Sequence, residues 1–182
     1  MLEISYLELV AVTTIIWVVV RLIVAKKSNN FSVKREALLI LVYICIIVIA
    51  RMVNFPFHHE NGHIAPMVFD ASQIYPFWLN LVPLVHLADV YDGWQINIIG
   101  NITMFIPVGI VWPVCFKKLN SVGKVTLAGF GFSLAIEIFQ LLFYDRCSDV
   151  DDLFLNTLGT FIGAVIYFAI KKIYDKKHTS HK

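Results

Sequence analysis

The chain has 182 residues, of which 58% are hydrophobic and 15% charged, and its formal net charge is +2. A soluble domain carries about a quarter charged residues. With a mean hydropathy of +0.73, this composition excludes an ordinary soluble domain and indicates a polytopic membrane protein. No nucleic-acid partner is expected, and because the three cysteines include no C-x-x-C pair, no disulfide framework is expected either.

Five apolar stretches are long enough to cross a bilayer, which takes about 20 residues. We predict helices over about 4–25, 37–53, 96–116, 122–144 and 153–170. They form an all-α, polytopic transmembrane helical bundle, and residues 1–182 are expected to be a single integral-membrane domain. The N-terminus lacks the basic region and cleavage site of a signal peptide, so the first helix is expected to remain in the mature protein.

Basic residues follow the first, third and fifth predicted helices, in the segments 26–35, 117–124 and 171–182. These three segments alternate correctly for one side of the membrane, and the positive-inside rule makes that side cytoplasmic. The predicted topology therefore has the N-terminus outside and the C-terminus inside. It places the segment 54–95 and the turn 145–152 on the outer side.

The outer segment 54–95 is rich in aromatic residues, and its four prolines (Pro56, Pro66, Pro76 and Pro83) exclude a long helix. Aromatic rings suit the headgroup region of a bilayer, where one part of the ring is wet. Two interpretations remain open: a loop lying on the membrane surface, or a lid over an outward-facing site.

Polar residues recur at helical spacing within three of the apolar stretches. An ionisable group at membrane depth costs about 2.5–3.5 kcal/mol on the insertion scale, so such residues need a reason. Residues three or four apart share a helix face, which predicts one polar site in the outer part of the bilayer. The three faces carry Asn97 and Asn101; Ser133, Glu137, Gln140 and Tyr144; and Asp149, Asp152, Asn156, Gly159 and Gly163.

The predicted binding residues are polar groups from these faces and from the turn between the last two helices. Arg146 is the nearest candidate counter-charge for Glu137. The alternative is structural: the amides act as interhelical hydrogen bonds, and the aspartates, Asp151 above all, as solvated helix caps. The binding set is Asn97, Asn101, Glu137, Gln140, Arg146, Asp149, Asp152 and Asn156.

Four further residues are expected to shape the helices. Gly159 and Gly163 form a small-x-x-x-small pair, which lets another helix approach closely. Pro107 cannot donate to the carbonyl of Thr103, so a bend is expected there, with Gly109 adding flexibility.

A site this poor in positive charge would repel a bare phosphate, but it would accept a cationic group directly or a phosphate through a bridging divalent cation. Three functions remain open. The first is a non-enzymatic protein that binds an envelope component or drug at its outer face, with dependence on a cation or metal ion, and the second is an ion-coupled carrier using Glu137. The third is an intramembrane enzyme for a lipid-linked substrate, with Glu137 as base or metal ligand and Asp149 and Asp152 as ligands of Mg²⁺ type. Neither a Ser-His-Asp set nor an H-E-x-x-H motif supports the enzyme.

Four segments of the chain form a recognisable pattern: N-L-V-P-L (80–84), N-I-I-G-N-I-T-M-F-I-P-V-G (97–109), E-I-F-Q (137–140) and D-V-D-D-L-F-L-N-T-L-G (149–159). Together they resemble the VanZ-like family over about residues 80–168. The resemblance implies a multi-pass protein of the bacterial plasma membrane. The family's founding member is associated with resistance to glycopeptide antibiotics, teicoplanin in particular, so the implied partners are membrane lipids and a cell-wall precursor lipid or a lipoglycopeptide. The family brings no established catalytic mechanism.

Overall fold

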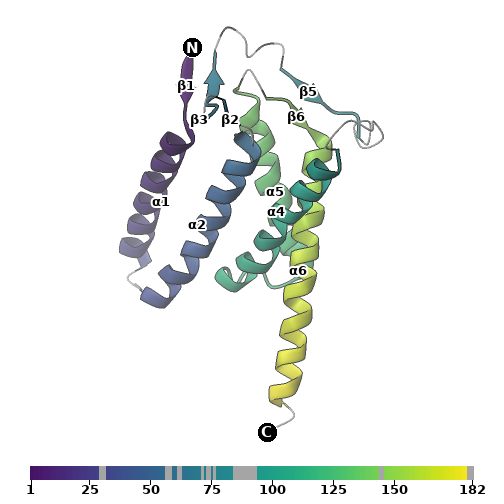
Figure 1. The fold of residues 1–182 in the computed structure, drawn as a ribbon. Coiled ribbons are helices and arrows are strands. Elements are labelled where there is room, and N and C mark those ends of the chain that lie inside the picture. The colour runs from purple at the N-terminus through teal and green to yellow at the C-terminus, as the bar shows by residue number, and fades with distance from the viewer. Residues whose placement is uncertain are drawn as a thin grey trace. The chain divides into compact units, whose positions relative to one another are not determined.

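The structure, a computed structural model, describes residues 1–28, 32–55, 59–60, 63–70, 72, 75, 77–83, 94–143 and 146–179. Within these residues, five helices are long and apolar enough to cross a membrane, which confirms the predicted all-α transmembrane class. They are α1 (Tyr6–Ser28), α2 (Val33–Asn54), α4 (Trp94–Cys115), α5 (Val122–Gln140) and α6 (Val150–Thr179) (Figure 1).

The predicted end of α5 is wrong, because the helix stops at Gln140 and does not reach residue 144. The chain then turns, with the N–H groups of Leu142 and Phe143 donating to the carbonyls of Phe139 and Gln140. Glu137 therefore lies about 4.5 Å from the helix end at 1.5 Å per residue, and not about 10 Å. Tyr144, placed on the same face by the sequence, lies outside the described residues.

The predicted end of α6 is wrong in the other direction. The helix begins at Val150 and continues past residue 170 to Thr179. Its last part is rich in lysine, which is a good helix former. The helix therefore does not stop where the apolar stretch stops.

Contacts divide the chain into two compact units. The first unit contains Met1–Leu79 and Phe139–Ser148, and the second contains Asn80–Ile138 and Asp149–Lys182. The interpretation of residues 1–182 as a single domain stays a prediction, and each unit is described by itself.

In the first unit, a short strand precedes the first helix. Strand β1 (Leu2–Ile4) pairs antiparallel with β4 (Met67–Phe69), and β2 (His59–Glu60) pairs with β3 (His63–Ile64). The buried side chains of Phe55, Met67 and Phe143 form the core beside these two strand pairs.

Helix α1 begins with a capping box. The carboxylate of Glu8 accepts the Ser5 N–H at 2.8 Å, and the Ser5 hydroxyl oxygen accepts the Glu8 N–H at 3.3 Å. This reciprocal pair satisfies two backbone donors at the helix start. Farther along, Arg21 of α1 forms an ion pair with Glu36 of α2 at 2.6 Å.

In the second unit, α4 and α6 approach closely through glycines. A Cβ atom on Gly159 would fall on the carbonyl oxygen of Ile102, and one on Gly163 would fall on that of Ile106. A Cβ atom on Gly109 would likewise meet the backbone of α6. Helix α4 continues through Pro107 and Pro113, and the bend expected at Pro107 stays a prediction.

The outer segment contains short strands that its sequence did not predict. Strand β5 (Leu79–Asn80) pairs with β6 (Ser148–Asp149), and the N–H of Ser148 donates to the carbonyl of Trp78 at 3.0 Å. The unit boundary passes through both strands. Residues 84–93 lie outside the described part, so the choice between a surface loop and a lid stays open.

Candidate functional site

The polar residues of the second unit meet at the start of α6, where Asp149 is the N-cap. Its Oδ1 accepts the backbone N–H of Asp151 at 2.8 Å, the bond that satisfies a donor of the first helical turn. The same oxygen accepts the side-chain amide of Asn80 at 3.0 Å. The backbone N–H of Asp149 donates to Glu137 Oε2 at 2.9 Å. Asp149 thus links β5, α5 and α6.

Helix α5 contributes two buried residues one turn apart. Glu137 is 4% exposed and Ser133 is fully buried. The Ser133 hydroxyl accepts the side-chain N–H of Asn156 on α6 at 2.9 Å. The Glu137 carboxylate accepts the backbone N–H of Asp149. Such a charge-assisted hydrogen bond is roughly twice as strong as a neutral one. The polar face of α5 therefore meets the polar face of α6.

Helix α4 contributes Asn101, which is buried. Its side-chain amide donates to Asp152 Oδ1 and, at 3.4 Å, to the side-chain oxygen of Asn97. Asn97 itself is exposed. The predicted α4 face thus reaches α6 through Asn101, with Asn97 at its edge.

Asn156 has an unsatisfied oxygen inside the unit. The side chain is 1% exposed, and its Oδ1 has no hydrogen-bond partner within the described part of the chain. A buried amide oxygen without a donor costs about 1–3 kcal/mol. The atom therefore has capacity to accept a hydrogen bond from a bound group.

Carboxylates gather near Asp152. Those of Glu137, Asp149 and Asp151 all lie close enough to act electrostatically on it. Neutral amides donate to Asp149 and Asp152, so these hydrogen bonds satisfy oxygens without cancelling charge. We call the seven residues that the hydrogen bonds above join the polar cluster: Asn80, Asn101, Ser133, Glu137, Asp149, Asp152 and Asn156.

Two predicted binding residues, Gln140 and Arg146, belong to the first unit. Gln140 is buried, and its Oε1 has no partner among the described residues. Arg146 donates to the carbonyl of Asn54 at 2.8 Å, and Arg51 donates to that of Phe55 at 3.0 Å. Cationic side chains at a helix C-terminus satisfy its last carbonyls, so Arg146 helps to cap α2. Its pairing with Glu137 stays a prediction.

Two features in or beside the polar cluster were missed from the sequence. Asp151, interpreted as a solvated cap, is only 4% exposed, because the first turn of α6 packs inside the unit; the capping residue is Asp149. Asn80 was noted only as part of a family segment. Its hydrogen bond to Asp149 joins residues 69 positions apart, which helical spacing cannot reveal.

Among the described residues, no group of three or more His, Cys, Asp or Glu side chains is arranged to hold a metal ion. The cluster oxygens receive hydrogen bonds from separate donors in place of converging on one point.

In the described part of the chain, five helices are long and apolar enough to cross a membrane, and buried polar side chains join three of them. This architecture is that of a polytopic membrane protein. The family model described as VanZ/LLP1 matches residues 37–171, and the chain belongs to this family. The match begins earlier than the resemblance at about residue 80, so α2 is part of the family region.

The chain is also similar to a curated relative named Protein VanZ, from Enterococcus faecium. The two are 30% identical over 99 residues, which are 54% of this chain and 58% of the relative. No solved structure matches the chain.

Proposed function

We propose that this protein is a multi-pass protein of the bacterial plasma membrane whose polar cluster binds a cationic group of an envelope component or drug. By doing so it lowers susceptibility to glycopeptides of the teicoplanin type. The observation that carries the proposal is the burial of the Glu137 carboxylate, 4% exposed, beside Asp149 and near Asp152.

The charge of the cluster selects the ligand. Two of its carboxylates, Asp149 and Asp152, receive hydrogen bonds from neutral amides, so these partners bring no positive charge into the cluster. In a medium of low dielectric constant, opposite charges attract and like charges repel far more strongly than in water. An ammonium group is favoured, and a bare phosphate is disfavoured.

The hydrogen bonds favour an organic group over a metal ion. A divalent cation needs several oxygens converging at about 2.0–2.6 Å, and the donors now bound to Asp149 and Asp152 would have to leave. An ammonium or amide donor needs only acceptors. The unsatisfied Oδ1 of Asn156 is one such acceptor.

The setting comes from the family and from the pattern of basic residues. The match to Protein VanZ covers only 58% of that protein. A role in glycopeptide resistance is therefore proposed for this chain and not taken over from the relative. The positive-inside rule puts the lysines near the ends of α1, α4 and α6 in the cytoplasm. With that topology, the start of α6 lies at the outer side of the membrane.

The test is the teicoplanin susceptibility of a deletion strain complemented with variants. Glu137→Gln and Asp152→Asn each remove one charge and keep the size of the side chain. The matched control makes the first of these changes at an exposed position, Glu3→Gln in β1. Protein levels are checked by immunoblotting of membranes.

The wild type and the control should restore the original susceptibility, and the two cluster variants should not. Full rescue by Glu137→Gln and Asp152→Asn would reduce the cluster to a scaffold and overturn the proposal. As a second readout, the affinity of purified protein in nanodiscs for teicoplanin should fall with rising salt and in Asp152→Asn. An affinity indifferent to both would exclude a cationic contact.

A further inference from the structure

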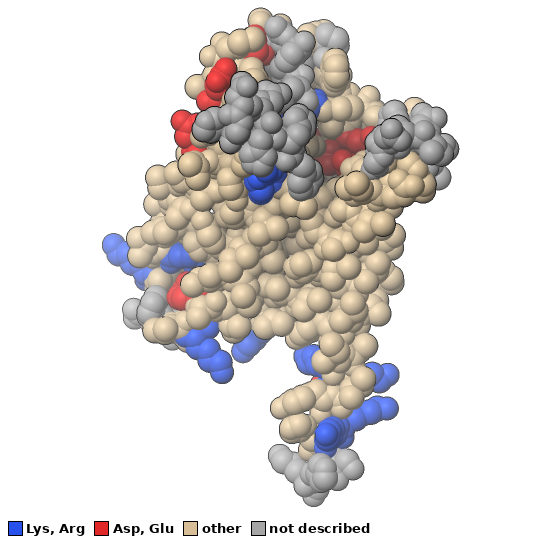
Figure 2. All heavy atoms as spheres, viewed as in Figure 1, with Lys and Arg blue, Asp and Glu red and all other residues tan. Residues whose placement is uncertain are grey.

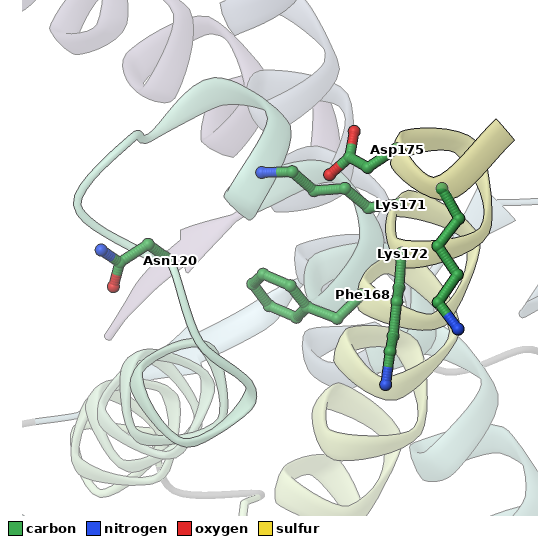
Figure 3. Close-up of a pocket in the computed structure, with 6 residues that line it drawn as sticks. Asn120, Phe168, Lys171, Lys172 and Asp175 are labelled. Atoms are coloured by element: carbon green, nitrogen blue, oxygen red, sulfur yellow. The ribbon is translucent and has the colours of Figure 1, made fainter. Parts of the chain in front are cut away.

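The other end of α6 carries a pocket of about 530 Å³, far along the helix from the polar cluster. In Figure 3, Lys171 and the ring of Phe168 extend from α6 toward Asn120 of the loop between α4 and α5. We call it the tail pocket; it is lined by Asn120, Phe168, Lys171, Lys172, Asp175 and Lys176.

The length of α6 indicates where this pocket lies relative to the membrane. The helix has 30 residues, and about 20 cross the hydrocarbon core. Counted from Val150, that span ends near Ile170. Lys171 and the residues after it therefore lie at the level of the lipid headgroups, and Figure 2 shows lysines gathered around this end of α6.

The lining residues share one face of the helix. Positions 168, 171, 172, 175 and 176 differ by three or four, the spacing of a single face. This face presents three lysines against one aspartate. Lysine near a helix C-terminus is favoured by the macrodipole at any position around the helix. The dipole does not explain why three of them line one pocket together with Phe168.

The facing loop adds a donor. Lys124 Nζ donates to Asn120 Oδ1 at 2.8 Å, which fixes the amide and leaves its NH₂ group as the donor side. Lysine ammonium groups together with an amide N–H donor can bind a phosphate. An aromatic ring at the same depth is suited to the boundary between headgroup and acyl chain.

We propose that the tail pocket binds the phosphate headgroup of an anionic phospholipid of the adjacent leaflet. Lys171, Lys172 and Lys176 contact the phosphate, and Phe168 contacts the glycerol and upper acyl region. Basic pockets between helices on the cytoplasmic side are typical sites for such lipids. This site is independent of the polar cluster.

The test uses the full-length protein in detergent, titrated with phosphatidylglycerol or phosphatidylcholine and monitored by native mass spectrometry. Lys176→Gln removes a lining charge. Lys177→Gln removes the same charge one residue along the same helix, outside the pocket lining. Both lysines are exposed, so the fold is expected to tolerate either change, which circular dichroism would verify.

Wild-type protein should prefer phosphatidylglycerol. Lys176→Gln should weaken its binding about fivefold, the effect of one basic residue at a membrane surface, and Lys177→Gln should not. Equal losses in both variants, or no loss in Lys176→Gln, would overturn the pocket. Displacement of the lipid by an equal concentration of inorganic phosphate would show a soluble anion site and overturn the lipid assignment.

Discussion

The backbone N–H of Asp149 donates to the Glu137 carboxylate at 2.9 Å, while the side chain of Asp149 caps α6. One residue therefore fixes the end of α5 to the start of α6. Glu137 therefore has two roles that can be tested separately. Its carboxylate oxygen accepts the hydrogen bond, and its negative charge is needed for the proposed ligand.

Substitutions at Glu137 should separate these roles. Glutamine keeps an oxygen for the Asp149 N–H, so Glu137→Gln is expected to lower the unfolding temperature less than a variant without an acceptor. Methionine has similar length but no comparable acceptor, and a buried N–H left unsatisfied costs about 1–3 kcal/mol. Thermal unfolding in detergent measures both variants. If Glu137→Gln were as destabilised as Glu137→Met, the charge itself would be part of the fold.

The cap of α6 provides a second prediction. Asp149→Ala should lower the free energy of unfolding by about 0.5–2 kcal/mol, because the first turn loses its acceptor. Asp149→Asn should cost less, since asparagine is an equally good N-cap. Asn80→Ala should be less destabilising in Asp149→Ala than in the wild type, because the bond between the two side chains is already lost there and only the Val82 N–H bond to Asn80 Oδ1 remains. Additive effects would contradict that coupling.

Helical spacing predicted much of this site. It placed Ser133, Glu137, Asp152 and Asn156 on facing stripes, and hydrogen bonds join α5 to α6 and α4 to α6 through these stripes. Such reasoning works because the geometry within a helix is fixed. The capping box at Ser5 and Glu8 also has a local sequence signature, S-x-x-E.

The remaining features depend on contacts distant in sequence. The pairing of β5 with β6 determines that Asn80 reaches Asp149, and nothing local to either segment encodes it. The end of α5 at Gln140 was missed because the apolar run continues beyond it. The hydrogen bond from Arg146 to the carbonyl of Asn54 joins residues 92 positions apart, and the predicted pairing of Arg146 with Glu137 stays a prediction.

The bond between Asn101 and Asp152 leads to a third prediction. Asn101→Leu removes the amide that donates to the Asp152 carboxylate, and losing a hydrogen bond to a charged group costs about 1.5–3 kcal/mol. Asp152→Asn should recover part of that loss in the double variant, because a neutral amide is cheaper to leave unpaired than a carboxylate. A double-mutant cycle by thermal unfolding measures the coupling. A coupling of zero would show that the amide does not stabilise the charge.

The packing of α4 against α6 makes the fourth prediction. A Cβ atom on Gly159 would fall on the carbonyl oxygen of Ile102, so Gly159→Ala must push the two backbones apart. Overpacking of this kind costs about 1–3 kcal/mol. Gly131 on α5 is the matched control, because a Cβ atom there meets nothing within 4 Å. Alanine in a helix is favoured over glycine by about 0.5–1 kcal/mol, so Gly131→Ala should hold or raise the unfolding temperature. If both variants were equally stable, α4 and α6 could not be in the close contact that aligns Asn101 with Asp152.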